Sequence, residues 1–181
     1  MLDLNLFATQ VHENAKAHGW WDEPRTFPEI CALIHSEWSE AVEAYRNREG
    51  MIWFDHEKGN KPDGIAIELI DGCIRIMDWM GRERYAMTPD TIRDGYKLLS
   101  ERRKAQIGAE TLPELVARLH MHTSDAYVSK ESSDERGECL QAALITACYW
   151  LSRNDIDPED VLMIKHEYNK TRPYRHGGKA L

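Results

Sequence analysis

Two pairs of acidic residues carry the clearest potential for chemistry in this sequence. Within each pair the spacing is three residues: Glu37 with Glu40, and Glu68 with Asp71. In a helix, that spacing places both carboxylates of a pair on one face. Two such helices side by side would bring four carboxylates together, where like charges repel and disfavour ionisation. A hard divalent cation relieves this repulsion, and oxygen ligands suit Mg²⁺ or Mn²⁺. The spacing therefore predicts a metal site on these four residues.

The first pair needs a helix, and the sequence predicts one over residues 27–47. Apolar residues recur there at helical spacing, and Thr26 and Pro28 are residue types typical of a helix start. On this helix Glu37 falls at the edge of the apolar stripe, whereas Glu43 points away from it. Because a charge at that edge is partly buried, we expect Glu37 to need a partner.

The second pair lies in a predicted helix over residues 65–82. Its apolar face is broad, and the opposite flank carries Glu68, Asp71, Arg75 and Asp78. Arg75 follows Asp71 by four residues, so a surface ion pair between them is an alternative explanation for part of this flank. For both acidic pairs, the alternative to a metal site is that the carboxylates form the solvated polar flanks of amphipathic helices.

The rest of the sequence also predicts helices, which gives an all-α fold class. Residues 50–63 carry turn signals and are predicted to form a loop. We expect a helical bundle of about seven helices in a single domain, residues 1–181. The further helices are predicted over residues 3–18, 88–104, 112–127, 135–153 and 158–169.

A weak internal repeat is visible as well. Residues 27–35 align with residues 112–120, and both segments contain a proline at their second position and end in histidine. In this register His122 and Asp125 take the places of the first acidic pair. The second half therefore repeats the helical plan without the acidic cluster. The predicted halves are residues 1–107 and 108–181.

The composition indicates an intracellular globular protein. With 181 residues, 42% of them hydrophobic, the chain can bury a core. Its four cysteines form no CxxC pair, which indicates reduced thiols and a cytoplasmic location. No signal peptide is expected, and no apolar run approaches the ~20 residues of a membrane span. The net charge of −8 disfavours a general nucleic-acid binder.

The end of the sequence is basic and can bind phosphate. Lys165 and Asn169 lie four residues apart, so one helical face would present a cation and an amide together. Arg172 and Arg175 follow, and arginine offers the paired donors that phosphate favours. A solvated, charged chain end is the alternative. The segment from Gly177 to Lys179 lacks the strand and helix of a phosphate-binding loop.

The order Glu-x-x-Glu, spacer, Glu-x-x-Asp resembles the signature of the MazG-like all-α nucleoside triphosphate pyrophosphohydrolases. The segment Gly19-Trp20-Trp21, upstream of the first pair, is similar to the family as well. Near the end of the sequence, Lys165, Asn169 and Arg172 are similar to the Lys-x-x-x-Asn-x-x-Lys/Arg element that closes these domains. This chain departs from a single-repeat member, because its acidic pairs lie in the first half and its Lys-Asn element in the second. The site would therefore be assembled across the two halves.

The resemblance implies a Mg²⁺-dependent enzyme that cleaves a (deoxy)nucleoside triphosphate between its α and β phosphates. The products are a nucleoside monophosphate and pyrophosphate. Family members hold the cation on the four carboxylates, and a carboxylate-held water attacks in line. By this resemblance Glu37 and Glu40 are the predicted catalytic residues, with Glu37 holding or activating the water. The predicted substrate-binding residues are Lys165, Asn169, Arg172, Arg175, Trp20 and Trp21.

Other functions stay open from the sequence. The same fold can serve a guanosine polyphosphate (alarmone) hydrolase, and no residue distinguishes the two substrates. A non-catalytic helical regulatory or interaction module is a third interpretation, and it predicts no metal binding. As an alternative to binding substrate, Trp20 and Trp21 could be loop aromatics that cap the end of the bundle. The predicted partner is a nucleotide, without nucleic acid or membrane, and a homodimer is one option.

Overall fold

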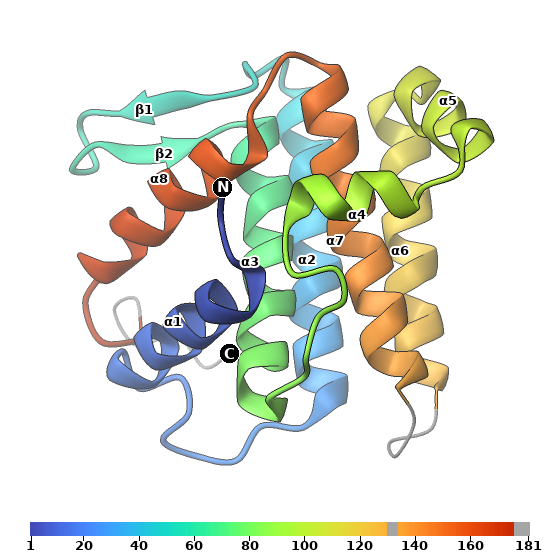
Figure 1. The fold of residues 1–181 in the computed structure, drawn as a ribbon. Helices are drawn as coiled ribbons and strands as arrows, with labels where there is room; N and C mark the ends of the chain where they lie inside the picture. Colours follow the sequence, from blue (N-terminus) through green and yellow to red (C-terminus); the bar gives the residue numbers. More distant parts are fainter. Residues whose placement is uncertain (130–133, 176–181) are drawn as a thin grey trace.

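Eight helices and one two-stranded hairpin make up the part of the chain that the structure, a computed structural model, describes: residues 1–129 and 134–175. The predicted all-α class is confirmed, with one helix more than expected (Figure 1). The helices are α1 (Leu4–Ala17), α2 (Phe27–Arg46), α3 (Ile65–Glu83), α4 (Ile92–Leu98), α5 (Glu101–Ala109), α6 (Leu112–Val128), α7 (Glu135–Arg153) and α8 (Pro158–Lys170). The strands are β1 (Trp53–Asp55) and β2 (Lys61–Asp63).

Helix α3 is the central element of the fold. It packs against α1, α2, α7 and α8, and α6 completes the bundle by packing on α2 and α7 (Figure 1). Because helices surround α3 on several sides, the polar residues Glu68 and Asp78 are buried along with its apolar ones. Because α3 is central, its polar flank lines a pocket instead of facing solvent.

Helices α2 and α6 begin in the same way. Thr26 and Glu29 form a capping box at the start of α2, and Thr111 and Glu114 form one at the start of α6. In each box the glutamate accepts hydrogen bonds from the backbone N–H and the hydroxyl of the threonine, at 2.6 to 2.8 Å. Each helix also has a proline in its first turn, where a missing N–H is harmless. The predicted starts of both helices are confirmed.

Matching residues of the sequence repeat meet where α2 and α6 pack together. The two contacts below each join residues 85 positions apart, which is the offset of the repeat. The rings of His35 and His120 stack, with their Nδ1 atoms 2.7 Å apart. Trp38 Nε1 donates to Thr123 Oγ1 at 3.0 Å in the buried interface. Residues on a twofold axis contact their own counterparts, so these contacts are those that a duplicated helical hairpin would make.

The segment predicted as a loop, residues 50–63, contains a β-hairpin. Strands β1 and β2 pair antiparallel, with Trp53 opposite Asp63. The turn residues Gly59 and Asn60 lie in the connection and both have positive φ, 70° and 64°. Strands of three residues are too short to produce a periodic signal, which is why the sequence shows only the turn.

The helix predicted over residues 88–104 is also wrong, because the structure has two helices there, α4 and α5. Ser100 separates them, and its side chain accepts a hydrogen bond from the backbone N–H of Arg103. Serine favours this N-cap position over a helix interior, since its hydroxyl competes for backbone hydrogen bonds. The new cap ends one helix and starts the next.

Close packing between α2 and α3 depends on a glycine. Gly72 of α3 lies against the indole ring of Trp38, and a methyl group in its place would overlap that ring. The Trp38 side chain is fully buried. Its contact with Gly72 therefore sets the separation between the two helices that carry the acidic pairs.

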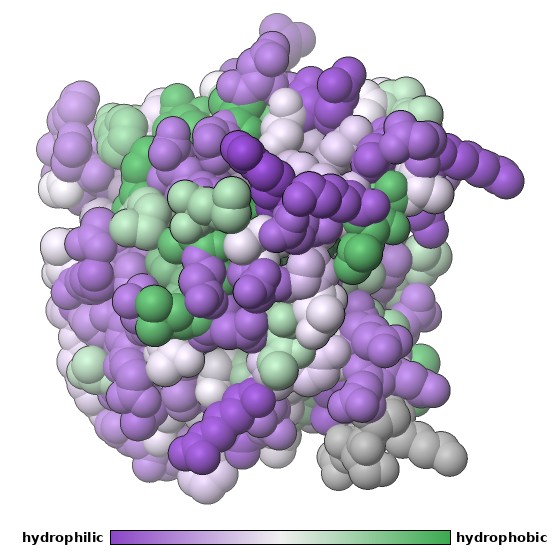
Figure 2. All heavy atoms as spheres, in the orientation of Figure 1, coloured by the Kyte–Doolittle hydropathy of each residue, from purple (hydrophilic) through white to green (hydrophobic). Residues whose placement is uncertain are grey.

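The surface is mainly polar on the face that Figure 2 shows, with hydrophobic side chains in small groups. In residues 1–129 and 134–175, no helix has the length and apolar character needed to span a membrane. All four cysteines are free thiols, and Cys31, Cys73 and Cys148 are buried.

Candidate active site

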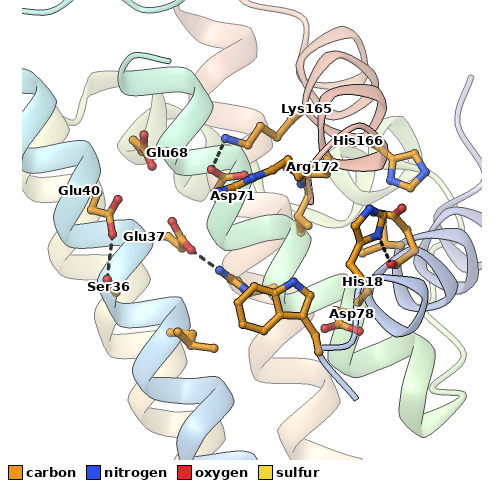
Figure 3. Close-up of a pocket in the computed structure, with 18 of the residues that line it drawn as sticks. His18, Ser36, Glu37, Glu40, Glu68, Asp71, Asp78, Lys165, His166 and Arg172 are labelled. Carbon is orange, nitrogen blue, oxygen red and sulfur yellow. Dashed lines mark hydrogen bonds and ion pairs between the residues drawn. The ribbon is translucent and has the colours of Figure 1, made fainter. Parts of the chain in front are cut away.

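A pocket of about 230 Å³ lies between α1, α2, α3 and α8. Carboxylates from α2 and α3 face each other across it, and cations reach in from α8 and the residues just after it (Figure 3). The structure therefore brings both acidic pairs and part of the basic chain end into one cavity. The residues concerned are Glu37, Glu40, Glu68, Asp71, Lys165 and Arg172.

Three of the carboxylates converge. One oxygen atom each from Glu37, Glu40 and Glu68 lies within 4.8 Å of the other two. Opposite ligands of an octahedral Mg²⁺ ion are about 4.2 Å apart, since metal–oxygen distances are close to 2.1 Å. Small side-chain rotations would let the three residues hold one such ion. Their oxygen donors fit a hard cation without selecting a particular one.

Burial makes the charges of two of these residues costly. Glu37 and Glu68 are only 8% and 7% exposed. Burial and then the nearby Asp71 raise the pKa of Glu37 to about 7. The same two causes raise the pKa of Glu68 to about 8, although Lys165 acts in the opposite direction. A bound cation would reverse both shifts, because it favours the charged form.

Two ion pairs connect the acidic residues to nearby cations. Arg75 Nε donates to Glu37 Oε1 at 3.0 Å, so Glu37 has the partner that its burial requires. Lys165 Nζ lies 2.6 Å from Asp71 Oδ2. The ion pair between Asp71 and Arg75 within α3, considered as an alternative from their spacing, is not among the ion pairs of the described residues. Arg75 instead reaches across to α2, where the Glu37 side chain is more deeply buried than that of Asp71 (10% against 16% exposed) and so needs a cation more.

Helix α8 and the segment directly after it bring three predicted substrate-binding residues to the pocket. Lys165, Asn169 and Arg172 all line the cavity. Lys165 is only 2% exposed. Asn169 Oδ1 is a buried acceptor for which the structure, over the residues it describes, shows no donor. An unsatisfied buried acceptor costs ~1–3 kcal/mol. A ligand hydroxyl or N–H group at this point would therefore be favourable.

The hairpin adds a cation, Lys61 of β2, which lines the pocket. Its Nζ lies 2.5 Å from Asp63 Oδ2, and the two residues share one face of the strand. Burial by itself would lower the pKa of Lys61, but Asp63, Glu68 and Asp71 outweigh this effect and raise it. Because β2 leads directly into α3, this positive charge is held beside the start of that helix.

The opposite end of the pocket lies along α1. Asn14 and His18 line it together with His166 of α8. Figure 3 shows both histidines on the side away from Glu40 and Glu68. His18 Nδ1 lies 2.8 Å from the backbone oxygen of Asn14, so this nitrogen carries a proton and donates it. This end offers hydrogen-bonding groups without a cluster of carboxylates.

The two predicted aromatic residues have different surroundings. Trp20 lines the pocket, and the guanidinium groups of Arg25 and Arg75 lie 5.1 and 5.9 Å from the centroid of its ring. Trp21 is outside the pocket lining, and its Nε1 donates to both oxygens of Asp78 at 2.9 and 3.1 Å. Trp20 can contact a ligand directly, whereas Trp21 fixes the position of Asp78.

Arg175, another predicted substrate-binding residue, is also outside the pocket lining. Its Nε donates to the backbone oxygen of Gly19 at 3.1 Å, and its backbone N–H donates to that of His18 at 3.0 Å. These bonds hold the chain end against the connection between α1 and α2. Gly177, Gly178 and Lys179 lie outside the described residues.

Sequence reasoning missed the contributions of α1 and the hairpin. No motif marks Asn14 or His18, whose place in the site follows only from the packing of α1 on α3. A weak signal exists for Lys61, because Lys61-Pro62-Asp63 places two opposite charges on one face of an extended segment directly before the second acidic helix.

The chemistry of the pocket has to be read from its own residues. No protein-family model, curated protein or solved structure matches the chain. The pocket places carboxylates that can hold a divalent cation beside lysine and arginine side chains that can hold phosphate. Such an arrangement suits a ligand that brings phosphate together with a divalent cation.

Proposed function

We propose that this protein is a Mg²⁺-dependent nucleoside triphosphate pyrophosphohydrolase of the MazG-like all-α type. The observation that carries the proposal is the convergence of Glu37, Glu40 and Glu68 in a pocket that also contains Lys165 and Arg172. Phosphoryl transfer needs positioning and neutralisation of charge more than covalent chemistry from the protein. Carboxylates for a cation and basic groups for phosphate supply both. The order of the acidic pairs and the Lys-Asn element along the sequence supports the same choice.

In this proposal Glu37, Glu40 and Glu68 hold the metal ion. When bound, Mg²⁺ would neutralise phosphate oxygens and make the phosphorus under attack more electrophilic. Asp71 is the fourth carboxylate of the sequence motif, and its ion pair with Lys165 holds that lysine at the pocket. Lys165 and Arg172 then neutralise phosphate charge next to the bond that breaks.

Glu37 is the residue that we assign to the attacking water. It is buried in the wall of the pocket, and as a charged carboxylate it can accept a proton from a water held beside it. The hydrogen bond from Arg75 fixes the orientation of its carboxylate. Glu37 thus holds the water in line, and the leaving group is pyrophosphate.

The nucleoside part of the substrate would occupy the α1 end of the pocket. Asn169 Oδ1 needs a donor, which phosphate oxygens do not provide but a sugar hydroxyl or a base N–H group does. Asn14, His18 and Trp20 line the cavity as well. This assigns the oxygen of Asn169 to the nucleoside and leaves its amide nitrogen for phosphate.

A nucleotide panel assayed with Mg²⁺ for pyrophosphate and for orthophosphate tests the proposal. We expect pyrophosphate release from at least one nucleoside triphosphate, and a loss of at least about 100-fold in kcat/KM for Glu37→Gln. Glu43→Gln is the matched control, because Glu43 lies on the same helix but is exposed. No turnover of any nucleotide, or release of orthophosphate alone, would contradict the proposal.

Metal binding separates the enzyme from a non-catalytic helical module. Calorimetric titration of the wild type with Mg²⁺ or Mn²⁺ should show one site, and Glu68→Gln should weaken it because one of the three converging ligands loses its charge. A wild type that binds neither ion would leave the module as the better interpretation.

A further inference from the structure

We infer that Lys61 binds the terminal phosphate of the substrate and makes the site selective for triphosphates over shorter phosphate chains. The inference rests on the proposed function. It adds to the site a residue from the hairpin, outside both the acidic pairs and the basic element of α8.

The direction of the pocket follows from α3. Glu68, Asp71, Arg75 and Asp78 recur at helical spacing on one face of α3 and all line the cavity. With a rise of about 1.5 Å per residue, this wall extends about 15 Å. Lys61 precedes the helix start and interacts with Glu68 and Asp71, so it lies at the Glu68 end. Asp78 is at the other end, where His12 of α1 lies 2.8 Å from it, and Figure 3 shows His18 on the side away from Glu68.

A substrate aligned with this wall has its terminal phosphate near Lys61. The nucleoside takes the end with the hydrogen-bonding groups of α1, and the reacting phosphate lies beside the converging carboxylates. The remaining phosphates then point toward the start of α3, where the hairpin holds Lys61. The nucleoside monophosphate product does not extend this far, whereas pyrophosphate does.

The contacts of Lys61 leave it able to bind phosphate. An ammonium group has three N–H donors, and only the Asp63 carboxylate is hydrogen-bonded to it in the described structure. The side chain is 30% exposed, so it is partly buried but still accessible to a ligand. Asp63 is itself held by the backbone N–H of Gly64 at 2.9 Å, which fixes the direction in which Lys61 is drawn.

Lys58 of the same hairpin provides a matched control. It also pairs with an aspartate of the hairpin, with Nζ 3.1 Å from Asp55 Oδ2, but it is 73% exposed. It is not part of the pocket lining. A general effect of lowering the positive charge of the hairpin would therefore appear in both Lys61→Met and Lys58→Met, whereas a phosphate contact would appear only in the first.

Calorimetric titration with pyrophosphate and with a nucleoside monophosphate, both in the presence of Mg²⁺, tests the inference. For Lys61→Met we expect the Kd of pyrophosphate to rise at least about tenfold, because a hydrogen bond to a charged group is lost. The Kd of the monophosphate should change less than about twofold, which also shows that the variant is folded. Lys61→Arg should retain most of the pyrophosphate affinity, and Lys58→Met should resemble the wild type for both ligands.

The possible failures can be told apart. If the wild type releases pyrophosphate from nucleotides, the role of Lys61 alone is overturned by any of three results: a wild type that binds no pyrophosphate, a pyrophosphate Kd that is unchanged in Lys61→Met, or an equal loss of affinity for both ligands in that variant. A wild type that releases no pyrophosphate from any nucleotide overturns the proposed function itself.

Discussion

Among residues 1–129 and 134–175, Glu68 is a buried acid without an ion pair of its own. Lys61 and Lys165 both interact electrostatically with Glu68. However, Lys61 is hydrogen-bonded to Asp63, and Lys165 forms its ion pair with Asp71. Glu37, in contrast, has Arg75. A buried carboxylate in this position lowers the stability of the fold unless it is protonated or neutralised. This residue therefore reports most directly on whether the pocket holds a cation.

In the absence of metal, Glu68→Gln should stabilise the protein increasingly as the pH rises. In the folded state burial raises the pKa of Glu68 from 4.5 to about 8. Between these values the folded state holds a proton that the unfolded chain has released, so the stability of the wild type falls relative to that of the variant. Near pH 8 we expect a difference of roughly 2–4 kcal/mol. Denaturant unfolding from pH 5 to 8 with a chelator measures it.

Added Mg²⁺ should reverse this difference, because a ligand that binds only the folded state stabilises it and the wild type binds it more tightly. A difference in unfolding free energy that does not depend on pH would show that Glu68 keeps an ordinary pKa, and the site would then be more solvated than its burial indicates.

At the scale of elements, the geometry of the site depends on the distance between α2 and α3. Three of the four acidic residues can converge because these helices approach closely, and Gly72 against the ring of Trp38 permits that approach. Trp38 is held in turn by its hydrogen bond to Thr123 of α6. The second half of the chain therefore braces the residue that spaces the acidic helices of the first half.

Gly72→Ala should weaken both the fold and the metal site. The added methyl group overlaps a rigid buried ring, which typically costs about 1–3 kcal/mol of stability, and relief requires the helices to separate. Urea unfolding and Mg²⁺ calorimetry measure the two effects. Gly108→Ala in α5 is the control, since its nearest neighbours are atoms of the Arg153 side chain, at 3.3 Å and beyond. We expect no loss of stability there, and equal losses for the two variants would remove the special role of Gly72.

At the scale of the whole molecule, neither half contains a complete site. The converging carboxylates belong to α2 and α3, whereas Lys165, Asn169 and Arg172 come with α8. The halves also share one core, because α2 packs on α6 and α3 packs on α7 and α8. Separating them would expose the apolar surface of both.

Residues 1–107 expressed alone should therefore fail to unfold cooperatively. Ile34 and Trp38 are fully buried in the complete chain, and the fragment lacks α6, on which their helix packs. Circular dichroism during urea titration should show a broad, low-amplitude change, and adding residues 108–181 should restore a cooperative transition. A sharp transition of the first fragment alone, at the midpoint of the full chain, would show that the halves are independent domains.

Local signals explain which parts of the fold are predictable. Helix α7 is predicted at residues 135–153 and observed at Glu135–Arg153, and the starts of α2 and α6 follow from threonine, proline and glutamate at fixed spacing. The strands are three residues long and the Ser100 cap is a single local hydrogen bond, so neither leaves a periodic pattern. The edge position of Glu37 is readable from its own helix, but the burial of Glu68 is not, since it depends on neighbours such as α8, which packs on α3 from elsewhere in the chain.

The sequence by itself determined the helical class, most helix positions and the pairing of carboxylates on helix faces, because backbone hydrogen bonds and side-chain periodicity act within a few residues. Only the tertiary structure decided that Glu37, Glu40 and Glu68 converge, that Asp71 pairs with Lys165 instead, and that the hairpin places Lys61 at the same pocket. These contacts join residues far apart in the chain. They depend on how the helices pack, and no local spacing encodes that packing.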